Sequence, residues 1–217
     1  MTVERKLTIF LLRHGEPEFP DLRSYIYGHT DYSLSARGIE QANRSGAALA
    51  DIKFDRIISS DLRRARQTAE IVNSHLVEPL NIVCDSAFRE INMGDWDGLP
   101  KEAIMEGFAE LFEKRGQDLV NTAPPNGESF ADLQKRAVAA FDRVVTDASG
   151  GGNILIVAHG GFFWTIVAGV LKMPLDMMFS FGLDFCALHM LEYKGDNCRL
   201  IRYNWSPDLT DYSEKIV

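Results

Sequence analysis

Residues 7–16 read LTIFLLRHGE, and this stretch decides the fold of the chain. Its first six residues are apolar except for Thr8, and such a run predicts a strand that is buried on both faces of a parallel sheet. Arg13, His14 and Glu16 follow directly. Because ligands of open α/β sheets bind beyond the carboxyl ends of the strands, we expect a ligand site at this point.

Two later segments repeat this arrangement. A strand is expected over residues 56–59, followed by the polar sequence SDLRRAR at 60–66, and another over 153–158, followed by HGG at 159–161. The carboxyl ends of neighbouring parallel strands lie at one edge of a sheet. We therefore predict that the chemistry of the protein lies just after these three strands.

The remaining pattern alternates strands and helices, which favours an α/β sandwich. Polar residues are expected to cap three helices, namely Ser35, either Ser60 or Asp61, and Ser129 with Asp132 as a capping box. Further helices are expected over 101–115 and up to about 171. Further strands are expected over 81–84, and over 185–193 and 199–203 as an antiparallel pair.

Residues 154–171 carry no formal charge, a length that raises the question of a membrane span. The sequence HGG at 159–161 interrupts the stretch, its first half is rich in β-branched residues, and its second half is typical of a helix. We predict a strand, a tight turn and a buried helix, and we expect no membrane partner.

The composition limits the classes of function. The chain has 217 residues, 46% of them hydrophobic, and we expect one globular domain over residues 1–217. The formal net charge of -8 opposes binding to nucleic acid or an anionic membrane, but not to a small anion in a locally basic pocket. Cys84, Cys186 and Cys198 lie far apart, which favours a reducing cytoplasmic location over a disulfide framework or a zinc site. The apolar terminal strands favour a homodimer.

The motifs at the three strand ends together resemble the histidine phosphatase superfamily, in its phosphoglycerate mutase-like branch. Within that branch the chain is most similar to small phosphatases such as α-ribazole-phosphate phosphatase. The resemblance implies a three-layer α/β/α sandwich with a mostly parallel central sheet. Other motifs that carry it are GHTD at 28–31, LSARG at 34–38, QA at 41–42, FRE at 88–90, GDWDG at 94–98 and GES at 127–129.

The resemblance implies a hydrolase of small phosphorylated metabolites that forms a phosphohistidine and uses no metal or other cofactor. His14 is the expected nucleophile, because a neutral imidazole can attack phosphorus when its other ring nitrogen donates to a fixed acceptor. Arg13 and Arg64 have planar guanidinium groups that match phosphate oxygens, and His159 is expected to donate to the same oxygens in its protonated form. Glu90 is expected to protonate the leaving alkoxide and later to activate water.

Four further residues are expected at the substrate. The amide of Gly28 is expected to contact the phosphate, as is the backbone at Gly160, which begins a helix whose dipole favours an anion. Glu16 lies close to His14 in the sequence, although Glu16 and Arg37 are more typical of structural ion-pair or hydrogen-bond groups. Phe162 is the aromatic residue best placed to touch a ligand, whereas its aromatic neighbours are typical of a core.

Some positions need a choice or depart from the family pattern. Of the arginines that follow the second strand, one is expected to point inward from the helix. The resemblance assigns this place to Arg64 and leaves Arg63 on a solvated helix face. Pro17 stands where the family often has Thr or Ser, and Trp164 stands where many members have Arg. The natural substrate is therefore not implied by the resemblance.

Three alternatives remain at this stage. A phosphoglycerate mutase would share the chemistry, but mutases of this branch generally carry additional chain around the site, for which 217 residues leave little room. A non-catalytic protein of the same fold would bind phosphorylated ligands without turnover, which the complete set of polar residues disfavours. A metallohydrolase would use His14, His159, Glu16 and Asp31, and a chelator would abolish its activity.

Overall fold

The computed structural model describes residues 6–21, 23–195 and 197–207, and its centre is a six-stranded sheet. The strands are β1 (Leu7–Arg13), β3 (Arg56–Ser59), β4 (Ile82–Cys84), β6 (Gly152–Ala158), β7 (Leu188–Lys194) and β8 (Asn197–Trp205). Their order in the sheet is β4-β3-β6-β1-β7-β8. The first four in this order run parallel, and β7 and β8 are antiparallel additions at one edge.

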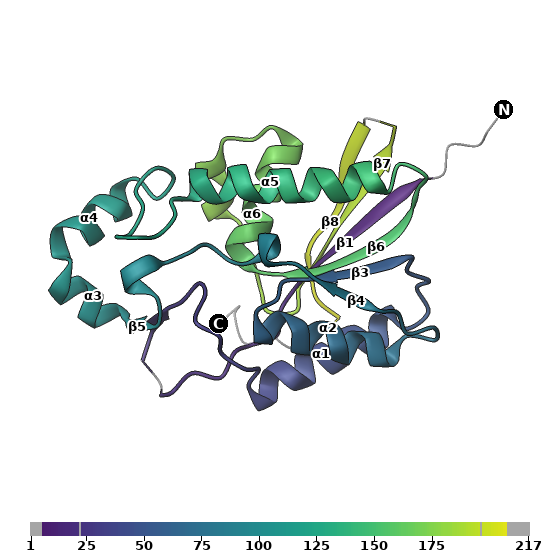
Figure 1. Ribbon diagram of the computed structural model, residues 1–217, viewed down its shortest axis with the longest axis horizontal. Coiled ribbons are helices and arrows are strands. Elements are labelled where there is room, and N and C mark those ends of the chain that lie inside the picture. Colours follow the sequence, from purple (N-terminus) through teal and green to yellow (C-terminus); the bar gives the residue numbers. More distant parts are fainter. Residues whose placement is uncertain (1–5, 22, 196, 208–217) are drawn as a thin grey trace, which may run out of the picture.

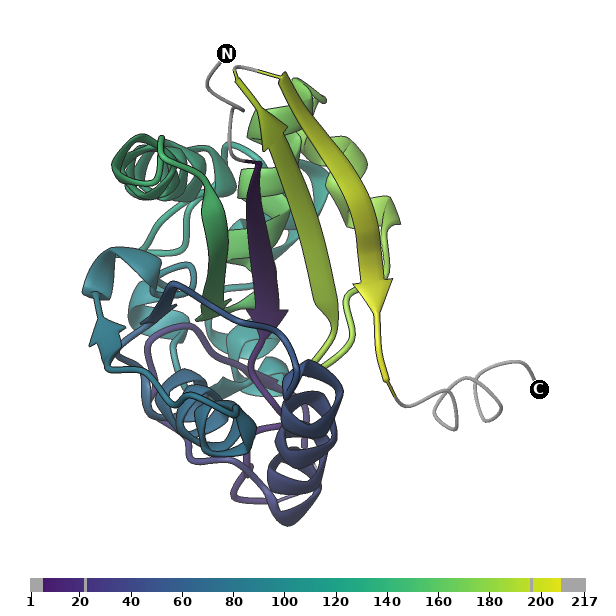
Figure 2. The ribbon, with the colours of Figure 1, turned by 90° about the vertical axis from the view of Figure 1, so that its right-hand side faces the viewer.

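Helices cover both faces of the sheet (Figure 1). On one face lie α1 (Ala36–Leu49) and α2 (Arg63–His75), and on the other lie α5 (Phe130–Asp147) and α6 (Gly160–Leu171), an arrangement that can also be followed in Figure 2. The predicted three-layer α/β/α sandwich with a mostly parallel sheet is confirmed.

A smaller group of elements extends from one end of the sandwich (Figure 1). It contains α3 (Lys101–Gly107), α4 (Ala109–Gln117) and a two-stranded sheet of β2 (Tyr25–Ile26) and β5 (Leu99–Pro100). Three 3₁₀ helices connect larger elements, namely η1 (Ser86–Phe88), η2 (Gly94–Trp96) and η3 (Leu175–Ser180).

The burial of β1 on both faces explains why its sequence is almost entirely apolar. Ile9 and Leu11 belong to the core that α5 and α6 share with the sheet, whereas Phe10 and Leu12 belong to the core under α1 and α2. Successive side chains of a strand face opposite sides of the sheet. Since helices cover both sides, both sets have to be apolar.

Two of the three predicted helix caps are confirmed. The side chain of Ser35 accepts a hydrogen bond from the amide of Gly38, and Ser129 and Asp132 form the reciprocal capping box at the start of α5. Such side chains satisfy amides at a helix start that have no partner within the helix.

The expected cap of α2 by Ser60 or Asp61 is wrong. Leu62 is the residue before the helix, and it makes no capping bond with its side chain. Both polar candidates have other partners, because Ser60 contacts His159 and Asp61 forms an ion pair with Arg89. The helix expected over 101–115 is also corrected, since it divides into α3 and α4 at Phe108, whose ring packs 5.9 Å from that of Trp96.

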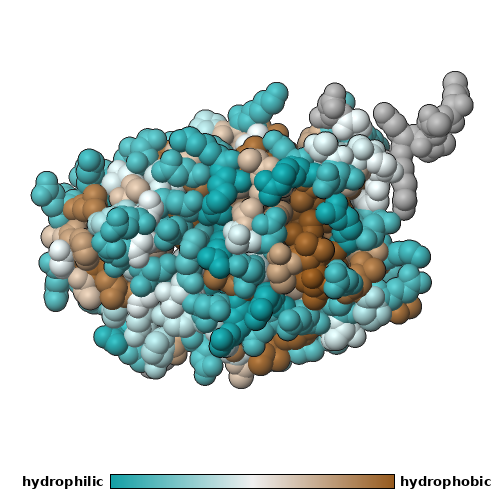
Figure 3. Space-filling model, viewed as in Figure 1, coloured by the Kyte–Doolittle hydropathy of each residue, from teal (hydrophilic) through white to brown (hydrophobic). Residues whose placement is uncertain are grey.

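The uncharged stretch 154–171 divides as predicted between β6 and α6. Across the residues that the structure describes, every helix falls short of the length and apolar character needed to cross a membrane. Hydrophilic side chains cover most of the face seen in Figure 3, interrupted by a few apolar patches.

Candidate active site

The three predicted strand ends meet at one edge of the sheet. Leu12 of β1 and Ser59 of β3 both pair with Val157 of β6, so the three strands end at the same level. The amide beyond β1, that of His14, donates to the carbonyl of Ala158 over 3.0 Å. This register places the polar residues that follow the strands next to one another.

His14 is held in one tautomer. Its Nδ1 lies 2.7 Å from the carbonyl oxygen of Gly15, and since a carbonyl only accepts, Nδ1 carries the hydrogen. Nε2 therefore has the free lone pair, which accepts a hydrogen bond from Nε of Arg64 over 3.3 Å. Burial, followed by the charges of Arg64 and Arg13, holds the pKa of His14 well below 6.5. The ring, only 1% exposed, is neutral at pH 7.

Arg64 is fully buried beside His14, as expected, whereas Arg63 is exposed and its amide donates to Asp31. The guanidinium of Arg64 donates from Nη1 to the carbonyl of Thr30 over 2.9 Å and from Nη2 to that of Gly28 over 2.7 Å. Residues 28–30 thus fix the plane of this guanidinium and its direction toward His14.

The carboxylate of Asp97 fixes the loop of residues 28–30, whose carbonyls bind Arg64. Its carboxylate accepts from the amides of Gly28, His29 and Thr30, over 3.0, 2.6 and 3.1 Å, and from the hydroxyl of Thr30 over 2.6 Å. Burial raises the pKa of Asp97, but these hydrogen bonds outweigh burial and leave the pKa below its ordinary value. The expected contact between the Gly28 amide and phosphate is corrected here, because that amide already donates to Asp97.

His159 faces His14, with 5.1 Å between the ring centroids. Its Nε2 lies 2.8 Å from the hydroxyl of Ser60, while its buried Nδ1 has no hydrogen-bond partner among the described residues. Burial, followed by the charges of Arg64, His14 and Arg13, holds the pKa of His159 well below 6.5. The ring is therefore neutral in this structure, whereas the protonated form is expected beside a phosphate dianion. When the hydroxyl of Ser60 donates to Nε2, the ring hydrogen is on Nδ1, and Nδ1–H can donate to a bound ligand.

Glu90 lies at the start of α6. Its Oε1 accepts from the amides of Ile91 and Phe162 over 2.9 and 3.1 Å, and its Oε2 accepts from the amide of Gly161 over 2.9 Å. The helix start that was expected to bind the phosphate thus binds this carboxylate instead. Gly161 is required for the approach, because a Cβ there would lie 2.6 Å from Oε1 of Glu90.

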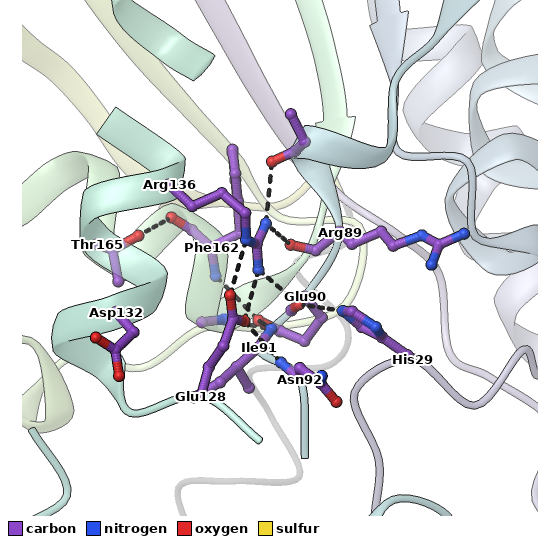
Figure 4. Close-up of polar contacts among 12 residues, drawn as sticks. His29, Arg89, Glu90, Ile91, Asn92, Glu128, Asp132, Arg136, Phe162 and Thr165 are labelled. Atoms are coloured by element: carbon purple, nitrogen blue, oxygen red, sulfur yellow. Dashed lines mark hydrogen bonds and ion pairs between the residues drawn. The ribbon is translucent and has the colours of Figure 1, made fainter. Parts of the chain in front are cut away.

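Arg136 fixes the chain on which Glu90 stands (Figure 4). Its guanidinium donates to the carbonyls of Ala87, Arg89 and Glu90 over 3.0 to 3.1 Å. An ion pair of 2.8 Å with Glu128, seen in Figure 4, orients the guanidinium. A half-buried arginine from α5 therefore determines where a carboxylate from a distant loop is placed.

Arg13 completes the group of polar side chains. Its guanidinium lies 4.1 Å from the ring centroid of Phe185 and donates from Nη1 to the carbonyl of Leu183. Its buried Nε has no partner among the residues that the structure describes. Arg13, Glu90 and Gly160 all line a cavity of about 530 Å³.

The comparisons with known proteins agree with this geometry. The family model described as "Histidine phosphatase superfamily (branch 1)" matches residues 9–206. The chain belongs to this superfamily. It is an enzyme of the histidine phosphatase type.

Individual relatives come from several bacteria. The chain is 32% identical over 178 residues to "Adenosylcobalamin/alpha-ribazole phosphatase" of Escherichia coli, covering 82% of this chain and 86% of the relative. It is 31% identical over 192 residues to "Probable phosphoglycerate mutase GpmB" of Shigella boydii, covering 87% and 86%. The solved structure of the alpha-ribazole phosphatase from Shigella flexneri superposes with a TM-score of 0.83 at 28% identity, covering 92% of this chain and 96% of that one.

In this histidine phosphatase, two residues that were expected to contact the substrate, Glu16 and Phe162, contact other parts of the protein instead. The carboxylate of Glu16 lies 3.2 Å from the hydroxyl of Ser35 and 3.9 Å from Arg37, so it braces the start of α1. The ring of Phe162 is fully buried, 5.3 Å from that of Phe88. Glu16 stands within a quoted motif and Phe162 directly follows one, but their surroundings come from distant segments.

The four candidate ligands of the metallohydrolase alternative do not all come together. Glu16 braces α1 and Asp31 binds the amide of Arg63, whereas His14 and His159 face each other. Within the described ranges, no three His, Cys, Asp or Glu side chains are grouped so that they could hold a metal ion.

Several residues of this histidine phosphatase site escaped the sequence analysis. Asp97 and Tyr27 lie inside or next to quoted motifs without an assigned role, and Ser60 was taken for a helix cap. Tyr27 lines the cavity, and the guanidinium of Arg64 lies 5.2 Å from the centroid of its ring. The position of Tyr27 immediately before Gly28 was the available signal. The sequence carries no such signal for Arg136, because an arginine in a long amphipathic helix is typical of a solvated face.

Proposed function

We propose that this enzyme hydrolyses small phosphomonoesters through a phosphohistidine formed at Nε2 of His14. One observation carries the proposal. Two buried nitrogens have no partner among the described residues, namely Nδ1 of His159, whose ring centroid lies 5.1 Å from that of His14, and Nε of Arg13. An unpartnered buried donor is costly, and phosphate oxygens would satisfy both.

The first step transfers the phosphoryl group to the enzyme. The lone pair of His14 Nε2 forms the P–N bond, the P–O bond to the leaving group breaks, and protonated Glu90 gives its proton to the leaving oxygen. Arg13, Arg64 and Nδ1–H of His159 donate to the equatorial oxygens, where negative charge accumulates. Arg64 can redirect its Nε–H from His14 to the phosphoryl group because the two lie in contact.

The second step returns the enzyme to its starting state. The phosphorylated ring of His14 keeps the hydrogen on Nδ1, donated to Gly15, and therefore carries a positive charge that favours loss of the phosphoryl group. Water attacks phosphorus, its proton passes to the Glu90 carboxylate, and the P–N bond breaks. Inorganic phosphate leaves, His14 is neutral again, and Glu90 is protonated for the next turnover.

The substrate is proposed to be a small phosphorylated metabolite. The names of relatives support this, since one acts on α-ribazole phosphate and another is named as a phosphoglycerate mutase. A mutase remains the second candidate. Phosphate release without transfer between the positions of glycerate supports the phosphatase, and isomerisation without release would support the mutase.

The decisive experiment is a phosphate-release screen over a metabolite panel, with and without a chelator. We expect turnover that the chelator does not change, and an acid-labile phosphoenzyme after rapid quenching. His14→Asn should lower kcat/KM by at least about 10³-fold. The control is His75→Asn, which removes a histidine bonded to Asn43 at the far end of α2. Near-normal activity of His14→Asn, or activity that depends on an added metal, would overturn the proposal.

The finer assignments of partner and location are also proposals. The free thiols of Cys84, Cys186 and Cys198 support a reducing, cytoplasmic location. The edge strand β8, with Trp205 40% exposed, supports a homodimer, which light scattering after size-exclusion chromatography distinguishes from a monomer. The net charge of -8 supports the absence of a nucleic-acid partner, and we further propose that the chain acts as one domain.

A further inference from the structure

Six of the sixteen residues that line the cavity beyond Arg13 and Glu90 are aromatic. Residues of four separate segments contribute rings, namely Tyr25, Tyr27, Phe130, Trp164, Phe179 and Phe181. Binding of the phosphoryl group requires none of these rings. The rings therefore indicate the chemistry of the leaving group, the part of the substrate that is not phosphate.

Three of these residues, Phe130, Trp164 and Phe179, form what we call the aromatic wall. The ring of Phe179 meets that of Phe130 at 4.9 Å and 69°, and that of Trp164 at 5.7 Å and 82°. These edge-to-face contacts are a favoured arrangement of aromatic rings. Because the rings restrain one another and come from α5, α6 and η3, the wall is rigid before a ligand arrives.

The rest of the lining continues this surface. The guanidinium of Arg115 lies 5.9 Å from the ring centroid of Phe130 and donates to the carbonyl of Thr122. This distance is that of a cation–π contact, so the guanidinium adds a positive charge at the edge of the wall. The remaining side chains around the cavity are largely apolar, among them Ile26, Ile91, Met93 and Leu183.

We propose that the leaving group of the substrate carries a flat aromatic ring that lies against the aromatic wall while the phosphate lies at Arg13. This inference rests on the proposed phosphatase function and names its substrate class. A flat ring gains contact with other rings and needs few hydrogen bonds. A polyhydroxylated leaving group would bury hydroxyls against apolar side chains, which is unfavourable. The volume of about 530 Å³ leaves room for a ring system next to the phosphate.

The test uses leaving groups that differ in flatness but little in size or intrinsic reactivity. Benzyl phosphate and cyclohexylmethyl phosphate both release a primary alcohol, and ethyl phosphate has no ring. For the wild-type enzyme we expect kcat/KM for benzyl phosphate to exceed that for cyclohexylmethyl phosphate by about 3- to 10-fold, the range of an aromatic pair.

A matched pair of variants locates the preference. Phe179→Leu should reduce the benzyl preference to below about 2-fold, and a circular dichroism spectrum and melting temperature close to those of the wild type would show that the variant is folded. Phe112→Leu is the control, because this half-buried ring packs 5.9 Å from Trp96 and does not line the cavity. The control should keep the wild-type preference.

Binding without turnover separates this inference from the proposed function. Calorimetry with benzylphosphonate and cyclohexylmethylphosphonate, which cannot be hydrolysed, should give the same preference in Kd. Turnover of all three esters with equal kcat/KM and equal phosphonate binding would overturn the aromatic leaving group and leave the phosphatase standing. Selective phosphonate binding with no ester hydrolysed would support the aromatic site and overturn the phosphatase.

Discussion

At the scale of single residues, the site depends on side chains that do not touch the reacting atoms. Asp97 binds three consecutive amides, the carbonyls of that loop bind Arg64, and Arg64 points at Nε2 of His14. Asp97 is therefore a positioning residue. Each link is a hydrogen bond of 2.6 to 3.3 Å between buried or half-buried groups, so a displacement at one end reaches the other.

Replacing Asp97 should show this dependence. Asp97→Asn removes the charge that holds the loop and places an NH₂ group against amide donors, so we expect kcat to fall by about 10- to 100-fold with a smaller change in KM. Steady-state kinetics on one phosphomonoester measures the split. Asp95→Asn is the matched control, since Asp95 is bonded to Asn126 at the surface. A lower thermal stability with unchanged kcat would assign Asp97 a purely structural role.

At the scale of elements, the start of α6 shows why a glycine pair follows His159. The first amides of a helix lack partners within the helix, and Glu90 supplies an acceptor for those of Gly161 and Phe162. The helix dipole favours the carboxylate at this end. The absence of a side chain at Gly161 is what lets the carboxylate approach.

A methyl group at this position should displace Glu90. In Gly161→Ala the new Cβ would lie 2.6 Å from Oε1 of Glu90 and 3.2 Å from Phe130, so we expect kcat to fall by at least about 10-fold with the fold retained in circular dichroism. Gly116→Ala, also within a helix, meets nothing within 4 Å and should keep wild-type activity. Equal activity of the two variants would show that the placement of Glu90 is not needed for turnover.

At the scale of the whole molecule, buried histidines couple stability to pH. His189 joins the last two strands, where its Nδ1 accepts from the amide of Asn204 over 3.1 Å. Burial, followed by the charge of Arg13, lowers the pKa of His189 to about 4 from 6.5. His189 therefore becomes protonated near pH 6.5 in the unfolded chain, but only near pH 4 in the folded chain. Stability is full above pH 6.5 and is lost as the pH falls toward 4.

Urea unfolding at pH 7.5 and pH 5 measures this loss. From the two pKa values, His189 alone should lower the free energy of unfolding by about 2 kcal/mol between these pH values. His189→Gln should reduce the wild-type difference by that amount, although His14 and His159 continue to act in the same direction. An unchanged difference in the variant would mean that His189 is not the source.

Much of the fold could be predicted because local patterns carry it. Each of three local patterns predicts the burial or hydrogen bonding of its own segment. They are the apolar run of β1, the uncharged stretch of β6 and α6, and the capping box of α5. The predictions failed where a distant partner competed for a side chain. Ser60 binds His159 instead of capping α2, the Gly28 amide binds Asp97, and Glu16 faces α1. No local pattern contains these partners.

The amino-acid sequence by itself determined the α/β sandwich, the meeting of His14, Arg64 and His159 at the strand ends, and the superfamily. The sandwich and the meeting of these side chains follow from periodicity and from residue types next to one another in the chain, and the superfamily follows from the resemblance of the motifs. Only the tertiary structure decided that both histidines are neutral, that Glu90 binds the start of α6, and that an aromatic wall borders the cavity. The physical reason is that burial, pKa and ring packing depend on groups that are close in space but far apart along the chain.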